Sequence, residues 1–180
     1  MISRRRFLSA VALSVPLVGA SRRNLFASAL SPTAPRALAF HHTHTGERLE
    51  VEYFHDGVYL PDSLQTVDQF LRDFRTGDVH PIDPGLLDLL HELTDQTETS
   101  KAFQVISGYR SPATNEMLRH RSEGVAAGSL HMQGQAIDIR LPDVPLAKLR
   151  AAALSVARGG VGYYPASDFV HVDTGRVRRW

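Results

Sequence analysis

The segment SLHMQGQAIDIR, Ser129 to Arg140, decides the fold. Its second half alternates between apolar and polar side chains. Ile137 and Ile139 share one face of an extended chain, and Asp138 points to the other face. This alternation predicts a strand over 135–141, whose isoleucine face packs in the core and whose aspartate faces a surface or a cleft.

A second strand of the same kind follows near the end of the sequence, in the segment DFVHV that begins at Asp168. Over 169–173, Val170 and Val172 share one face of this strand and His171 lies on the other face. Two such strands can each present one polar side chain to the same cleft.

Three side chains of these segments form a candidate metal site. His131 lies in a loop before the first strand, Asp138 within that strand, and His171 within the second. Two imidazoles and one carboxylate, with a fourth position open to water, are typical ligands of a catalytic zinc ion. Spacing alone leaves a structural alternative open, in which Asp138 pairs with Arg140 and His171 is an ordinary strand residue.

Hydrolysis at such a site also needs a general base that lies near the metal without binding it. Asp168, three residues before His171, is one candidate, and Asp173 is the other.

The rest of the chain mixes helices and strands without a regular alternation. The pattern predicts a hairpin around 44–47, strands over 103–107 and 161–164, and helices that start at Pro61, cover 84–97, run from Pro112 to about His120 and cover 145–158. This order predicts an α+β fold, with helices packed on a small antiparallel sheet that carries the metal cleft. We expect two segments to be solvated, the histidine-rich hairpin at 41–44 and the basic end RVRRW at 176–180.

The composition limits the possible classes of site. Of the 180 residues, 43% are hydrophobic and 22% are charged, so the chain can bury a core. The net charge of +1 gives no electrostatic case for binding nucleic acid. The chain has no cysteine, which excludes disulfides, thiolate zinc sites and a cysteine nucleophile.

The N-terminal residues have the order of an export signal. Arg4–Arg6 are basic, and the apolar run over 7–20 is shorter than the roughly 20 residues that a membrane span needs. The piece SRRRFL resembles the twin-arginine signal, which the export machinery reads. We therefore expect an export signal over 1–29 that is removed, a linker over 30–39, and one folded domain over 40–180 without a membrane span.

The segment SLHMQGQAID resembles the S-x-H-x-x-G-x-A-x-D motif of the LAS-type zinc peptidases, which include D-alanyl-D-alanine dipeptidases and carboxypeptidases. The matching positions are Ser129, His131, Gly134, Ala136 and Asp138. DFVH is similar to the acidic-x-x-His ending of that group. Most of residues 40–180, including VISGYRSPATNEMLR and GGVGYYP, is similar to the murein endopeptidase K group of the M15 peptidases.

This resemblance implies that residues 40–180 form a zinc peptidase domain with His131, Asp138 and His171 as zinc ligands. It implies Asp168 as the base, and it implies that Arg110 binds a substrate carboxylate or the developing oxyanion. The implied activity is hydrolysis of cross-links between the stem peptides of peptidoglycan, in the periplasm, during cell-wall remodelling.

Two other functions stay open from the sequence. The first is a D,D- or L,D-carboxypeptidase or a dipeptidase that trims stem-peptide ends. The second, from another class, is a non-catalytic cell-wall binding module that keeps the fold. A binding module has no need of a base, so the presence of all three ligands, an acidic residue and Arg110 argues against it.

Overall fold

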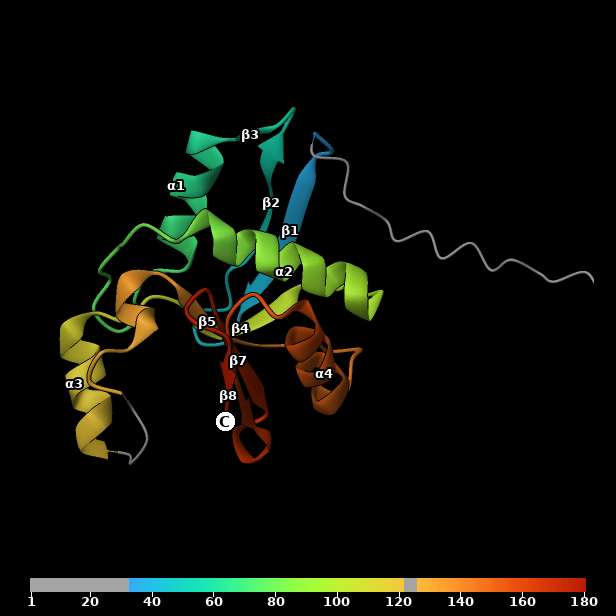
Figure 1. Cartoon of the computed structure of the whole chain (residues 1–180). Coiled ribbons are helices and arrows are strands. Elements are labelled where there is room, and N and C mark those ends of the chain that lie inside the picture. The colour runs from blue at the N-terminus through green and yellow to red at the C-terminus, as the bar shows by residue number, and fades with distance from the viewer. Residues whose placement is uncertain (1–32, 122–125) are drawn as a thin grey trace, which may run out of the picture. The chain divides into compact units, whose positions relative to one another are not determined.

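The computed structural model of the chain describes residues 33–121 and 126–180 (Figure 1). The expected export signal over 1–29 lies outside the described residues. The first strand begins at Arg36, within the segment 30–39 that we expected to be a linker. No helix among the described residues is long and apolar enough to cross a membrane.

In the described part of the chain, the strands form one eight-stranded sheet in the order β3-β2-β1-β4-β5-β7-β6-β8. The strands are β1 Arg36–His42, β2 Arg48–His55, β3 Val58–Tyr59, β4 Phe103–Ser107, β5 Ala136–Arg140, β6 Gly160–Tyr164, β7 Phe169–Asp173 and β8 Arg178–Arg179. Most pairings are antiparallel, but β1 pairs with β4 and β6 pairs with β8 in parallel. The predicted α+β class is confirmed, and the sheet is mixed and larger than the small antiparallel sheet we expected.

Four α-helices and two short 3₁₀ helices accompany the sheet in the described residues. They are α1 Pro61–Phe70, α2 Pro84–Thr97, α3 Pro112–Arg121, η1 Leu130–Gln133, α4 Leu146–Val156 and η2 Pro165–Ser167. The helix α2 packs against β1 and against α4, and α4 packs against β6 and β7 (Figure 1). These two helices close the core over the middle of the sheet.

The helix α2 has the bounds that its sequence predicts. The carboxylate of Asp83 accepts a hydrogen bond from the backbone N–H of Gly85 at 2.8 Å, as an N-cap residue does, and Pro84 occupies the first helical position. The leucines of this helix are buried against the sheet. The N-cap residue and the spacing of the apolar residues agree here, so the sequence alone predicts the bounds of α2.

The helix α1 starts at Pro61 as predicted and ends at Phe70, although apolar residues continue at helical spacing to Phe74. The carbonyl of Leu71 accepts a hydrogen bond from the backbone N–H of Tyr109 at 2.8 Å. This hydrogen bond joins Leu71 to a segment that is distant in the sequence, and it coincides with the end of the helix. The spacing of apolar residues along the helix cannot predict such a contact.

The histidine-rich hairpin is only partly solvated, which corrects our expectation for 41–44. His42 is 1% exposed, and its Nδ1 accepts long hydrogen bonds from the backbone N–H groups of His44 and Thr45. Its ring packs edge-on against Phe74, with ring centroids 5.4 Å apart. Burial lowers the pKa of His42 to about 4, so this histidine is a neutral core residue near pH 7.

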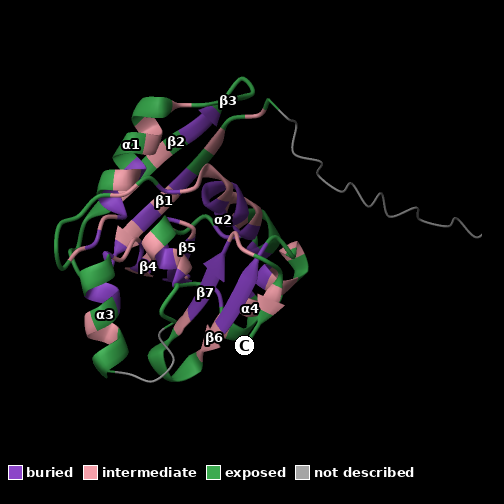
Figure 2. Cartoon of the chain, turned by 60° about the vertical axis from the view of Figure 1, so that its left-hand side comes forward, coloured by how far each residue is buried: buried purple, intermediate pink, exposed green. Residues whose placement is uncertain are grey.

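The antiparallel pairing of β5 and β7 joins the core to the polar site. Ile137 lies opposite Val172 and Ile139 lies opposite Val170, and all four residues are buried. Most of β7 has the colour of buried residues in Figure 2. Because side chains alternate along a strand, the residues between them point to the other face of the sheet.

Candidate metal centre

Asp138 and His171 face each other across the ladder between β5 and β7. They are register partners, and Asp138 Oδ1 lies 2.9 Å from His171 Nδ1. Both side chains are buried. The pairing of two strands, and not a loop, therefore fixes the distance between these two predicted ligands.

The short helix η1 brings His131 to the same place. The hydroxyl of Ser129 caps this helix by accepting a hydrogen bond from the backbone N–H of His131. Gly134 ends the helix in the left-handed region at φ +66°, where a Cβ would lie 2.1 Å from the carbonyl oxygen of Pro81. The serine and the glycine of SLHMQG thus shape the turn that delivers the histidine.

Three donor atoms converge, namely His131 Nε2, Asp138 Oδ1 and His171 Nδ1, all within 4.8 Å of one another. His131 Nδ1 lies 2.7 Å from the carbonyl oxygen of Gly108, and His171 Nε2 lies 3.0 Å from the carboxylate of Asp173. Both partners only accept hydrogen bonds, so each of these ring nitrogens carries the proton.

The opposite ring nitrogens consequently present lone pairs to one another and to a carboxylate oxygen. Three electron-rich atoms so close together repel one another, and a metal ion or a proton held among them offsets this repulsion. This donor chemistry fits a divalent metal ion with nitrogen and oxygen ligands.

Asp173 orients His171 from behind. Its side chain is fully buried, and it accepts hydrogen bonds from both terminal nitrogens of Arg178 and from the backbone N–H groups of Gly160 and Gly175. A carboxylate that fixes the tautomer and the ring of a metal-binding histidine is a recurrent feature of metal sites.

Arg110 lies at the wall of the cleft, where the resemblance places it. Its guanidinium donates to Asp138 Oδ2 and to Ser107 Oγ, and it lies 3.2 Å from His131 Nε2. Arg110 therefore holds the second oxygen of Asp138 and leaves Oδ1 directed at the two histidines.

His131 and Asp138 have the protonation that metal binding needs, whereas at His171 a metal ion competes with a proton. Burial lowers the pKa of His131, which keeps its imidazole neutral. Burial alone would raise the pKa of Asp138, but the contacts with His131 and His171 outweigh it and hold this pKa well below its usual range. Burial opposes protonation of His171 as well, but its contacts with Asp138 and Asp173 raise the pKa of this imidazole.

The three ligands lie in a cleft of about 750 Å³. The described residues that line it are Arg110, Ala126, Gly128, Ser129, Leu130, His131, Asp138, Tyr164, Ser167, Phe169, His171, Arg178 and Trp180. Asp138 is the only carboxylate among them.

The structure does not bring Asp168 into this cleft, although the sequence points to it as the base. Its carboxylate accepts a hydrogen bond from Arg140 at 2.7 Å, and 62% of its side chain is exposed. Arg140 thus pairs with Asp168 and not, as the structural alternative has it, with Asp138. The other candidate, Asp173, lies behind His171 with its oxygens already hydrogen-bonded, and its pKa is held well below its usual range. Neither Asp168 nor Asp173 therefore has a free carboxylate oxygen in the cleft beside the three donor atoms, where a general base would have to lie.

The C-terminal segment contributes residues that the sequence analysis missed. We expected RVRRW to be a solvated tail, but Arg178 and Arg179 form β8, and Arg178 and Trp180 line the cleft. The sequence contains one hint that this segment takes part in the site, because Trp180 is the one tryptophan of the chain. The pairing of β8 with β6 spans only two residues, which is too short for any periodicity.

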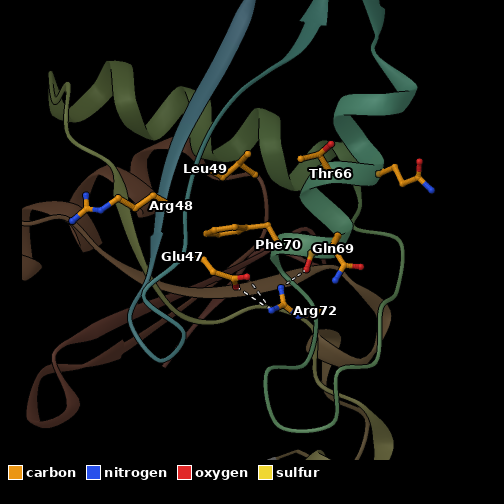
Figure 3. A pocket seen from close by; sticks show the side chains of 8 residues that line it. Glu47, Arg48, Leu49, Thr66, Gln69, Phe70 and Arg72 are labelled. Atoms are coloured by element: carbon orange, nitrogen blue, oxygen red, sulfur yellow. Dashed lines mark hydrogen bonds and ion pairs between the residues drawn. The ribbon is translucent and has the colours of Figure 1, made fainter.

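A second hollow, of about 530 Å³, lies between α1 and the start of β2 (Figure 3). Its only carboxylate, Glu47, forms an ion pair with Arg72 at 3.1 Å, and no histidine lines it. It lacks the donors of a metal site.

Comparisons with known proteins identify the family of this chain. The profile of the M15 peptidase family described as Peptidoglycan L,D-endopeptidase MepK matches residues 30–180. Peptidoglycan L,D-endopeptidase MepK of Escherichia coli (strain K12) is 47% identical over 151 residues, which cover 84% of this chain and 83% of that protein. The same values hold for the protein of that name from Shigella flexneri.

A probable peptidoglycan L,D-endopeptidase MepK of Haemophilus influenzae is 41% identical over 181 aligned positions, which cover 99% of this chain and 95% of that protein. The family that the residues of SLHMQGQAID predict is confirmed. The chain belongs to the MepK family of M15 peptidases.

Proposed function

We propose that this chain is an exported zinc metallopeptidase that hydrolyses peptide cross-links of peptidoglycan. The observation that carries the proposal is the convergence of two imidazole lone pairs and one carboxylate oxygen inside a cleft. Membership in the MepK family supports the same activity and substrate. Cross-links that join two diaminopimelate residues are the expected target.

His131, Asp138 and His171 are the proposed zinc ligands. A bound zinc ion supplies Lewis acidity and a nucleophile at neutral pH. The protein residues then have separate tasks. Asp173 keeps the His171 lone pair directed at the site, and Arg110 offers fixed positive charge to the scissile carbonyl or to a substrate carboxylate.

Substrate cleavage is tested with purified dimeric muropeptides. We expect the zinc-loaded mature protein to convert dimers cross-linked between two diaminopimelate residues into monomers, and a chelator to stop the reaction until zinc is restored. Chromatography with mass detection reads the products. Loss of single terminal residues would instead identify a carboxypeptidase. Binding of peptidoglycan without any new muropeptide would identify a non-catalytic module and contradict the proposal.

The role of Asp168 is tested with Asp168→Asn beside Arg140→Gln, which removes the other half of the ion pair. From the position of Asp168 we expect both variants to keep turnover within about threefold of wild type, because an exposed ion pair contributes at most about 1 kcal/mol. A general base contributes about 10²–10⁴-fold. A loss of that size in Asp168→Asn alone, with zinc content unchanged, would identify Asp168 as the base after all.

The proposed substrate also requires a location outside the cytoplasm. We propose that residues 1–29 direct the chain to the periplasm by the twin-arginine route, in agreement with the consecutive arginines at 4–6. Fractionation of cells that express the full chain, with and without replacement of these arginines by lysine, tests this proposal.

A further inference from the structure

Trp180 lies beside the proposed metal ligand His171, lines the cleft and is about half exposed. Its ring centroid lies 5.3 Å from that of His171, and the residue is 48% exposed. Tyr164 and Phe169 line the same cleft, so the ring belongs to an aromatic patch, and exposed apolar patches in a cleft mark ligand-binding sites.

Several contacts fix the position of this ring. The backbone of Trp180 exchanges hydrogen bonds with β6, donating to Val161 and accepting from Tyr163, both at 3.2 Å. Its Nε1–H donates to Tyr164 Oη at 2.7 Å. The guanidinium of Arg178 lies 4.9 Å from the ring centroid. The ring is therefore preorganised, so ligand binding does not cost the conformational entropy of ordering this side chain.

The sheet itself leaves room for the ring. Gly162 is the register partner of His171 on β6, so it lies on the face of the sheet that carries the ligands. A Cβ at Gly162 would lie 2.8 Å from Cε2 of Trp180. Any other residue at this position would push the indole away from its place beside His171.

The two sides of the cleft differ in chemistry. Arg110 contacts Asp138 and His131 and supplies positive charge on one side. Trp180 lies on the other side, past His171, and Phe169 and Tyr164 line the same cleft with rings stacked 4.6 Å apart. A substrate that spans the site meets the guanidinium of Arg110 at one end and, at the other, an aromatic wall that Arg178 flanks.

We infer that Trp180 is a specificity-determining residue, whose ring packs on the methylene chain of the diamino acid at the cross-link. This inference rests on the proposed function. The carboxylates of the same peptide are the groups that suit Arg110. An aromatic face gains from contact with an alkyl chain, and it does not need to touch the reacting atoms.

The test compares steady-state kinetics of Trp180→Ala, Trp180→Phe and Gly162→Ala on the dimeric muropeptide. Loss of the apolar contact should raise KM about tenfold in Trp180→Ala and in Gly162→Ala, with kcat and zinc affinity near wild type. Trp180→Phe, which keeps a ring, should stay within about threefold. The matched control is Val177→Ala, because Val177 is 66% exposed on the same segment but lies outside this cleft.

A second measurement needs no variant. Trp180 is the sole tryptophan, so its fluorescence reports on this site alone. Titration of the zinc-loaded protein with the monomeric muropeptide product should shift the emission saturably to shorter wavelength, and a triglycine peptide should not.

Three results would overturn the inference: an unchanged KM in Trp180→Ala, an equal rise in Val177→Ala, or an emission unchanged at product concentrations that inhibit cleavage. Failure of the wild-type protein to cleave any muropeptide would instead contradict the proposed function. The two failures are therefore distinguishable.

Discussion

His131→Ala should abolish cleavage of peptidoglycan dimers, with a loss of roughly 10³-fold or more, because the metal supplies both the nucleophile and the charge stabilisation of the reaction. The substitution leaves Asp138 and His171 as the two remaining ligands in a site built for three. We expect the purified variant to retain far less than one zinc per chain, which elemental analysis measures directly.

The control for this variant is His120→Ala. His120 lies on α3 with 76% of its side chain exposed and is not among the residues that line the cleft. It should keep wild-type zinc content and turnover. Full activity of His131→Ala in the absence of zinc would contradict the metal site, and so would equal losses in the two variants.

Asp138→Asn tests the same site without changing the size of a side chain. The amide keeps the shape of the carboxylate but removes the charge that balances a divalent ion and that Arg110 contacts. We expect a similar loss of zinc and of activity.

Asp173→Asn should weaken zinc binding about 10- to 100-fold, although Asp173 touches no metal, because partners behind the ligands have effects of that size. The carboxylate holds the proton-bearing nitrogen of His171 and so directs the lone pair of the other nitrogen. Competition with a chromophoric chelator measures the zinc affinity.

The same substitution should also destabilise the fold. Asp173 is fully buried and accepts hydrogen bonds from two backbone N–H groups and from Arg178, whose side chain is 29% exposed, so we expect a loss of about 1–3 kcal/mol. Denaturant unfolding of the zinc-free protein separates this effect from metal loss. Asp56→Asn is the control, because the Asp56 side chain is 85% exposed and its backbone has φ 48°, which asparagine tolerates. Equal stability of the two variants would contradict the supporting role of Asp173.

The sequence predicts helices and strands correctly where the local capping residues and the side-chain periodicity agree. The alternation in AIDIR and in FVHVD predicted both central strands, and Asp83 with Pro84 predicted the start of α2. Two of the three proposed ligands, Asp138 and His171, follow from the same alternation, because both lie on the polar face of their strand and paired strands share their faces. His131 comes from the short helix η1, whose turn depends on Ser129 and Gly134.

The remaining parts depend on contacts between distant segments. The two-residue strand β8 is held by its pairing with β6 and by Arg178, which reaches Asp173. The segment RVRRW has the composition of a solvated tail, so its place in the site could not be predicted. The same holds for Asp168, whose spacing from His171 fits a base while its side chain pairs with Arg140.

The ladder between β5 and β7 has a consequence for how the chain folds. The same register that buries Ile137 and Ile139 also sets Asp138 opposite His171. A slip of one residue would turn the isoleucines into the cleft and the aspartate into the core, because side chains alternate along a strand. A misaligned molecule would thus lack both its hydrophobic core and its metal ligands. A slip of one residue therefore removes the core packing of β5 and the metal site together, so the register that buries the isoleucines is also the one that assembles the site.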